Sequence, residues 1–137
     1  MHLFGALLLA VVSLGHATAD PAATLQNTPV FALGGIGVAG KMSDGERALR
    51  ALLKEPTATK QLESLLHVAT PAGQLYALLA LRTHDRAAYE RALAAFPKHD
   101  STVEIIGGSI VSQLPFRQLR ERIEAGTYDQ ALSRPPW

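Results

Sequence analysis

The sequence contains no cysteine, which excludes disulfide bonds and cysteine-ligated metal centres. A lipid anchor of the lipoprotein type is excluded for the same reason. Net charge is also low, because the chain has 13 Lys and Arg residues and 12 Asp and Glu residues, which gives a formal charge of +1. A chain this close to neutral lacks the electrostatic footprint of a nucleic-acid-binding protein, so we expect no nucleic-acid partner.

Long apolar runs are scarce, and the chain has its one clear example at the start. Residues 3–14 form an apolar run that fits the central region of a secretory signal and is too short to span a bilayer. Ala17-Thr18-Ala19 then supplies a small-residue cleavage site. No Lys or Arg precedes the run, so a buried N-terminal helix or a membrane anchor is the alternative. We predict that residues 1–19 are a signal peptide and that the mature chain has no transmembrane segment.

The rest of the chain is long enough for one domain. Removal of residues 1–19 from the 137 residues leaves 118, which can build one core but hardly two. Residues 20–29 are polar and carry two Pro, which predicts a flexible lead-in. We therefore expect a single helical domain over residues 30–132 and a short tail over residues 133–137.

Helix start signals recur along this domain. Ser43-Asp44-Gly45-Glu46 matches a capping box, and Thr70-Pro71 joins a capping hydroxyl to Pro at the first helical position. Further starts are expected after Pro56, at Asp85 and at Pro115. Apolar residues follow these starts at helical spacing, and the connections are short. The sequence thus predicts a mainly α fold of about five helices in antiparallel hairpins, with the apolar helix after Thr70 at the centre.

A small β element centred on two glycines is expected within residues 102–113. Runs rich in Val and Ile flank Gly107-Gly108, which is typical of a hairpin whose turn needs positive φ at both glycines. A helix pair broken at the glycines is the alternative. Two segments share one pattern, in which a Val is followed three positions later by Leu or Ile, then by two Gly and, three positions on, by another Val. The segments run from Val30 to Val38 and from Val103 to Val111. If this echo is structural, the two segments lie side by side in one small sheet.

Five residues between positions 70 and 97 have the spacing of a known helical repeat: Gly73, Tyr76, Tyr89, Ala92 and Pro97. They match its small, aromatic, aromatic, Ala and terminal Pro positions, and residues 126–132 are similar to the turn of such a repeat. This part of the chain therefore resembles one tetratricopeptide repeat. The resemblance implies a helical hairpin that serves as a protein-binding scaffold without catalysis.

A glycine-rich loop between residues 34 and 40 contains the pattern GxGxxG. A dinucleotide site would need this pattern between a strand and a helix, yet the helix cap stands later, at Ser43, and no βαβ alternation follows. An anion could bind the loop, although Asp44 and Glu46 already occupy the positive end of the helix. We expect no cofactor, and we predict that the loop binds a partner through Gly34, Gly35, Gly37 and Gly40.

The helix after Ser43 carries basic residues on its outer face. Arg47, Arg50 and Lys54 recur at helical spacing, and Lys60 continues the face on the next helix. A solvated helix face is the ordinary interpretation. The alternative is a patch that meets an acidic partner, so Arg47, Arg50 and Lys54 complete the predicted partner-binding residues.

Ser, His and Asp residues are the candidates for catalysis or metal binding in this chain. Ser109 follows two glycines but lacks the later Gly of a nucleophile elbow, so a hydrolase would have to pair it with His67, His84 or His99. The pairs His84-Asp85 and His99-Asp100 stand at opposite ends of one expected helix, too far apart to share a metal. We therefore expect no catalytic residue and no metal site.

Together these features predict an exported, non-enzymatic domain that binds another protein in the periplasm or outside the cell. An inhibitor or immunity-type protein is one form of this hypothesis, and an envelope assembly adaptor is another. The alternatives are a small periplasmic hydrolase that uses Ser109 with a histidine, and a small-ligand carrier.

Overall fold

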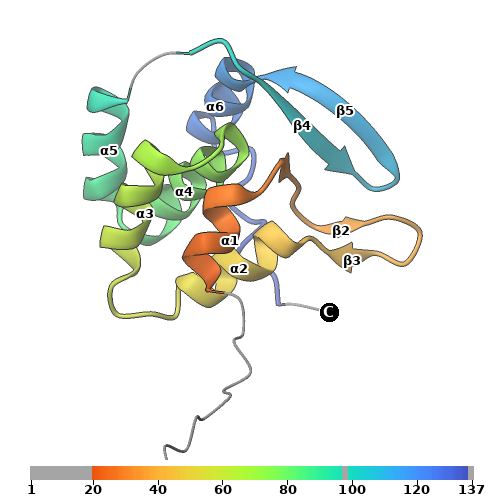
Figure 1. The fold of residues 1–137 in the computed structure, drawn as a ribbon, viewed down its shortest axis with the longest axis horizontal. Coiled ribbons are helices and arrows are strands. Elements are labelled where there is room, and N and C mark those ends of the chain that lie inside the picture. Colours follow the sequence, from red (N-terminus) through yellow and green to blue (C-terminus); the bar gives the residue numbers. More distant parts are fainter. Residues whose placement is uncertain (1–19, 97–98, 136–137) are drawn as a thin grey trace, which may run out of the picture.

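The structure is a computed structural model that describes residues 20–96 and 99–135. The predicted signal peptide lies outside these residues. The described part contains the following elements in chain order: α1 (Pro21–Asn27), β1 (Val30–Phe31), β2 (Gly35–Ile36), β3 (Lys41–Met42), α2 (Asp44–Leu52), α3 (Ala58–Val68), α4 (Pro71–His84), α5 (Arg86–Ala95), β4 (Thr102–Gly107), β5 (Ile110–Pro115) and α6 (Phe116–Glu124). Figure 1 shows the helices grouped on one side, with two β ribbons projecting from the other.

Helix α4 is the centre of the core. Every residue from Ala72 to Leu81 except Gln74 is buried, so nearly every face of the helix is covered by other elements. Thr70 caps it as predicted, because its side chain accepts a hydrogen bond from the Gly73 N–H at 3.1 Å. Helices α2, α3, α5 and α6 all pack against α4. Apolar residues on all faces therefore predicted a central helix correctly.

The prediction of a flexible lead-in over residues 20–29 is wrong. Asp20 caps helix α1, Pro21 occupies its first turn, and Leu25 is fully buried. Helix α1 approaches α4 at Gly73, where a Cβ atom would lie 2.1 Å from the Leu25 carbonyl oxygen. The glycine at this point therefore permits two helices to touch, and residues 20–29 belong to the folded domain.

The hairpin over residues 102–113 is confirmed, with a correction to its turn. Strands β4 and β5 are antiparallel in unbroken register, and Gly107 pairs with Ile110. The two turn residues are therefore Gly108 and Ser109. Of these two residues, only Gly108 has a positive φ, at 58°. A glycine at the first central position with an ordinary second residue fits a type II′ turn, which explains why one glycine is sufficient.

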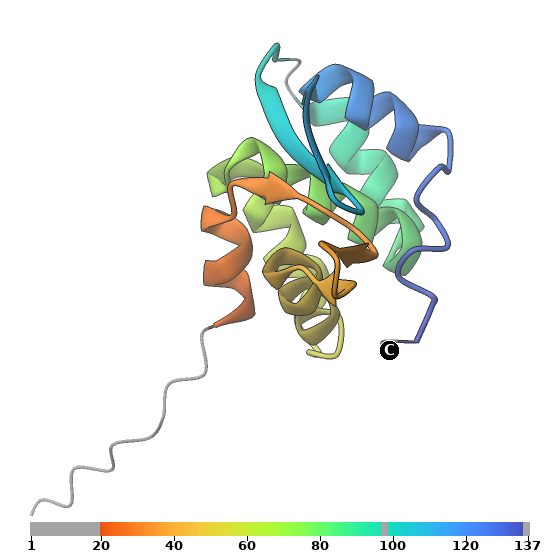
Figure 2. The same ribbon diagram turned by 90° about the vertical axis from the view of Figure 1, so that its right-hand side faces the viewer.

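The β structure is larger than the predicted element, so the fold is helical with a small mixed sheet. Strand β1 pairs with β4 in parallel, which gives the sheet order β1-β4-β5 (Figure 2). Strands β2 and β3 form a second, two-stranded ribbon. Ile36 makes a parallel bridge to Gly108, so the two glycine segments do lie side by side, as their similar spacing suggested. The expectation of about five helices also changes to six in the described part, because α1 was missed.

Candidate functional site

The pairing of β1 with β4 is interrupted, and the interruption opens a groove. Pairing ends at Phe31 and Ile105 and resumes at Ile36 and Gly108. Between these points, Ala32 is held away from β4 by a buried hydroxyl. The Ala32 N–H donates to the Tyr76 hydroxyl at 2.9 Å, and the Ala32 carbonyl accepts from the same hydroxyl at 2.8 Å. The strand edge is thus bonded to helix α4 where it would otherwise continue the sheet.

Ser43 completes this buried polar cluster. Its Oγ lies 3.2 Å from the Tyr76 hydroxyl, donates to the Ala32 carbonyl at 2.8 Å and accepts from the Glu46 N–H at 3.1 Å. Burial raises the pKa of Tyr76, so the phenol stays protonated and can donate. One half of the predicted capping box is therefore confirmed, and the capping hydroxyl also ties α2 to the strand edge.

The Glu46 side chain does not make the expected capping-box contact. Its carboxylate is fully buried and turns toward the glycine loop, where Oε2 accepts the Gly34 N–H at 2.8 Å. Oε1 pairs with Arg50, at 3.1 Å from Nε and 3.0 Å from Nη2. A buried carboxylate needs such partners, because an unpaired charge in the interior is costly. Glu46 therefore fixes Gly34, on one lip of the groove.

Arg50 fixes the opposite lip. Its Nη2 donates to the carbonyl of Ala131 at 3.0 Å, and its Nη1 donates to the carbonyl of Arg134 at 2.9 Å. These carbonyls belong to the C-terminal segment that follows α6. We name the buried pair Glu46–Arg50 the brace, because it connects the Gly34 loop on one side with residues 131–134 on the other. Both lips are thereby held by two residues one turn apart on α2.

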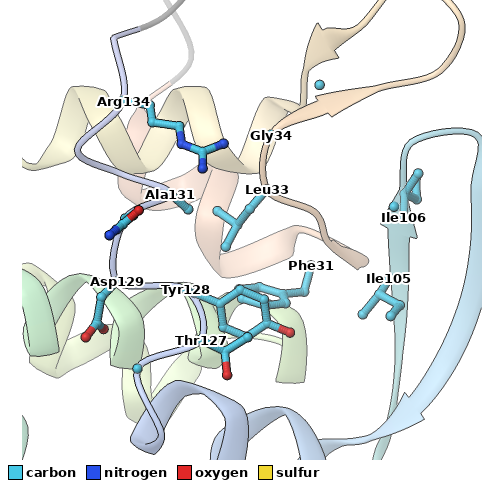
Figure 3. A pocket seen from close by; sticks show the side chains of 14 residues that line it. Phe31, Leu33, Gly34, Ile105, Ile106, Thr127, Tyr128, Asp129, Ala131 and Arg134 are labelled. Atoms are coloured by element: carbon cyan, nitrogen blue, oxygen red, sulfur yellow. The ribbon is translucent and has the colours of Figure 1, made fainter.

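The groove between the lips has a volume of about 840 Å³. Phe31 and Tyr128 form its aromatic floor, with ring centroids 5.5 Å apart in an edge-to-face arrangement. Leu33 lies on the lip beside the glycine loop, and Ile105 and Ile106 of β4 line the side of the groove away from the C-terminal segment (Figure 3). The volume falls within the range of ordinary ligand sites, about 300–1,000 Å³. The groove is therefore large enough for a bound segment or molecule.

Two charged residues on the C-terminal lip differ in their partners. Asp129 makes a bidentate pair with Arg82 of α4, at 2.7 Å and 3.2 Å, and this pair holds the pKa of Asp129 below its usual value. Figure 3 shows the Asp129 carboxylate pointing away from the aromatic floor. The Arg134 side chain lines the groove, and no ion pair to it is found in the described part of the chain. The charge available to a ligand here is therefore positive.

The tips of the two ribbons carry apolar side chains into solvent. Val38 is fully exposed, and Ile110 and Val111 are 70% and 59% exposed. The Gly37 N–H donates to the Gly108 carbonyl at 2.8 Å and holds the tips together. Val68 on α3 is the other large apolar side chain found exposed within residues 20–96 and 99–135. Three of these four side chains thus lie at one end of the molecule, which we call the ribbon tips.

A basic hollow lies against the β2–β3 ribbon. It has a volume of about 570 Å³ and is lined by Gly40, Lys41, Arg47, Arg50 and Lys54, among others. Arg47 is partly neutralised by Asp44, from which it lies 3.0 Å away, and both side chains are largely exposed. Exposed ion pairs of this kind contribute little free energy and are easily replaced by other partners, so the hollow retains a basic character.

The predicted partner-binding residues surround the β2–β3 ribbon. Gly34 and Gly35 line the groove, whereas Gly40, Arg47, Arg50 and Lys54 line the basic hollow. Gly37 connects the ribbon tips. The structure therefore brings these residues onto neighbouring surfaces, but it engages Arg50 in the brace with only 16% of its side chain exposed. Sequence reasoning missed Phe31, Ile105, Tyr128 and Arg134, since nothing local relates positions so far apart.

The features considered for chemistry are scattered. Ser109 is exposed at the hairpin turn, and no hydrogen bond joins it to a histidine of the described chain. Asp85 caps α5 through Ala88, which lowers its pKa, and His99 contacts Gln74. No group of three metal-ligating side chains occurs among the described residues. The GxGxxG pattern spans a β ribbon instead of a strand-to-helix turn, so a dinucleotide arrangement is not formed here.

No family model, curated protein or solved structure matches this chain. In the described portion, every helix is too short or too polar to cross a membrane.

Proposed function

We propose that this protein is an exported domain whose function is to bind another protein through the surface that contains the ribbon tips and the groove. The observation that carries the proposal is the cluster of Val38, Ile110 and Val111 at the ribbon tips. Exposed apolar side chains that gather in one place mark interaction surfaces, whereas isolated ones need no explanation. The resemblance of residues 70–97 to one tetratricopeptide repeat also favours protein binding.

The neighbouring surfaces support the same proposal. An apolar groove lies on one side of the β2–β3 ribbon and a basic hollow on the other, so a partner that covers the tips meets both. Apolar centres with polar or charged rims are usual in protein interfaces. An inhibitor of a secreted protein and an envelope adaptor remain the two forms that we propose.

The binding proposal is tested by comparative capture from the native envelope and secreted fractions. The bait is the mature chain, and the informative variant is Val38→Asp with Val111→Asp, which places charge at the ribbon tips. The matched control is Val68→Asp, which changes a valine on α3 that is 57% exposed, close to the 59% of Val111. We expect that wild type and the control retain the same protein, and that the double variant retains at least tenfold less of it. Equal retention by all three chains would contradict the role of the ribbon tips.

The export proposal needs its own test. Residues 1–19 combine a short apolar run with a small-residue cleavage site, so removal of these residues is expected to leave the protein in the cytoplasm. Cell fractionation of full-length and shortened chains measures this. The mature N-terminus, read by mass spectrometry, is expected at Asp20. A full-length chain that stays in the cytoplasm and remains uncleaved would refute export.

A small-ligand carrier is the second candidate, and the groove volume of about 840 Å³ favours it. Native mass spectrometry of protein purified from its own envelope measures this alternative. A carrier is expected to retain a small molecule that is lost after Ile106→Asp. The hydrolase alternative receives no comparable support, because Ser109 lies at an exposed turn.

A further inference from the structure

We propose that the groove binds an extended, apolar segment of the partner protein that carries one carboxylate opposite Arg134. This inference rests on the proposed function and names the part of the partner that is recognised. It is distinct from the ribbon tips, because the groove lies between β4 and the C-terminal segment.

The apolar part of the segment follows from the floor and walls of the groove. The rings of Phe31 and Tyr128 meet edge to face, and Leu33, Ile105 and Ile106 line the groove with them. The last three are only partly buried, so a ligand can still remove apolar area from water. Large apolar side chains of a partner are the groups that gain most from such a site.

The extended shape follows from the interruption of the sheet. Strand β4 forms one wall, and the chain that would pair with it leaves after Phe31 and returns only at Ile36. Ala32 cannot return to β4 without breaking its bonds to Tyr76 and Ser43. On β4, Ile106 and Gly107 lie between the last pair, at Ile105, and the bridge at Gly108, so the backbone of an extended peptide can pair there over two residues.

The carboxylate follows from the charges around the groove. Glu46 is paired with Arg50 behind Gly34, and Asp129 is paired with Arg82. The Arg134 guanidinium lies at one end of the groove (Figure 3) and has no ion pair in the described structure. Arginine binds a carboxylate through two parallel hydrogen bonds, so an Asp, a Glu or a C-terminus of the partner fits this end.

The groove is also prepared for binding before a partner arrives. The brace holds Gly34 on one lip and the carbonyls of Ala131 and Arg134 on the other. A site that is already ordered loses less conformational entropy on binding, which favours affinity for short segments. The residues that build the groove therefore have a role besides stability.

The charge requirement is tested with a phage-displayed library of random peptides, selected on the mature wild-type chain. We expect enrichment of peptides that combine two or more large apolar residues with one Asp, Glu or C-terminal carboxylate. The informative variant is Arg134→Glu, which is expected to weaken these peptides at least tenfold and to select Lys or Arg at the same place. The control is Lys60→Glu, an exposed change on α3 that is expected to alter neither selection.

Two outcomes of the selection would overturn the inference. One is enrichment of peptides without any acidic group, and the other is equal binding of the selected peptides to wild type and to Ile106→Asp. If either outcome occurs while capture still depends on Val38 and Val111, the protein binds its partner through the ribbon tips. The proposed function then stands, and the inference about the groove is wrong.

Photo-crosslinking in the native cell identifies the natural occupant. A benzophenone amino acid at position 106 places the reactive group in the groove, and the same residue at position 68 serves as the control. We expect a crosslink to one protein at position 106 only, on a peptide with apolar residues and a carboxylate. A lipid or small-molecule adduct at position 106, or equal crosslinking at both positions, would contradict a peptide site.

Discussion

The two sides of this molecule are held together by different forces. On the helical side, α4 is enclosed by α2, α3, α5 and α6, and its side chains are almost all apolar. On the groove side, four buried or half-buried polar residues, Ser43, Glu46, Arg50 and Tyr76, connect the strand edge and the C-terminal segment. Apolar packing tolerates exchange of one hydrophobic residue for another of similar volume, whereas a polar network depends on each partner.

This difference separates stability from site geometry. The helical side supplies most of the buried apolar area, while the polar network determines where the groove opens. Changes on the helical side should therefore lower the free energy of unfolding and leave the groove intact. Changes in the network should alter the groove even where the loss of stability is moderate.

The largest effect is expected from Leu78→Ala on α4. The leucine is fully buried, so its truncation leaves a cavity and should lower the free energy of unfolding by about 4 kcal/mol. Urea unfolding followed by circular dichroism measures the change. Val68→Ala, on an exposed residue of α3, is the control, with an expected change below about 0.5 kcal/mol. Backbone chemical shifts of Gly34 and Ala131 should stay as in wild type, and large shifts there would break the proposed separation.

Glu46→Gln should follow, with a loss of about 3 kcal/mol. The amide can still accept from Gly34, but Arg50 loses its counter-charge while only 16% of its side chain is exposed. The same unfolding experiment measures the loss, with Glu63→Gln on α3 as a control of little effect. In contrast to the leucine variant, chemical shifts should change on both lips of the groove. An unchanged spectrum at the C-terminal lip would show that the brace is not needed there.

Tyr76→Phe should cost about 1–2 kcal/mol. The change leaves the buried N–H of Ala32 without its acceptor, whereas the Ala32 carbonyl keeps its bond to Ser43. Tyr89→Phe is a matched control, because the buried Tyr89 hydroxyl has the Arg82 guanidinium nearby but makes no hydrogen bond of ordinary geometry within the described residues. We expect the control to change stability by less than about 0.5 kcal/mol. Equal losses in the two variants would mean that the bonds to Ala32 do not stabilise the interrupted strand.

The smallest expected effect concerns pH and His99, on the helical side. Burial lowers the pKa of His99 in the folded protein, and its Nδ1 has no hydrogen-bond partner among the described residues. The unfolded chain therefore binds this proton first as the pH falls below about 6.5. The free energy of unfolding should be constant above that pH, decrease below it and level off once the pH passes the folded pKa. Denaturant titrations between pH 5 and 7 measure this slope.

A variant isolates the contribution of His99 to that slope. In His99→Gln the decrease between pH 6.5 and 5 should become smaller than in wild type. The groove should be unaffected in this variant. An identical slope in the His99 variant would assign the pH dependence to other groups.

Local signals explain why the helices could be predicted from the sequence. The caps at Ser43, Thr70 and Asp85 each depend on residues within four positions, and the same holds for the hairpin turn. Helix α1 was missed because two prolines and polar residues surround its one fully buried leucine, and its burial depends on Gly73, far along the chain.

The groove could not be predicted in this way. Arg50 reaches carbonyls more than 80 residues later, and Phe31 meets Tyr128 across the molecule. A capping box also predicts that Glu46 turns back on its own helix, yet a stronger requirement prevails. The buried carboxylate needs a cation and an N–H, and Arg50 and Gly34 supply them. Such competition between local and distant partners is not visible in residue spacing.

Hydrogen exchange of the Gly34 and Ala131 amides in wild type and in Arg50→Met tests the brace most directly. Both amides are hydrogen-bonded, to Glu46 and to the Tyr128 carbonyl, and each lies on a different lip. We predict that both amides are protected in wild type and that both lose protection in the variant, while amides of α4 keep theirs. Loss of protection on one lip only, or equal loss throughout α4, would contradict the claim that one ion pair holds both sides of the groove.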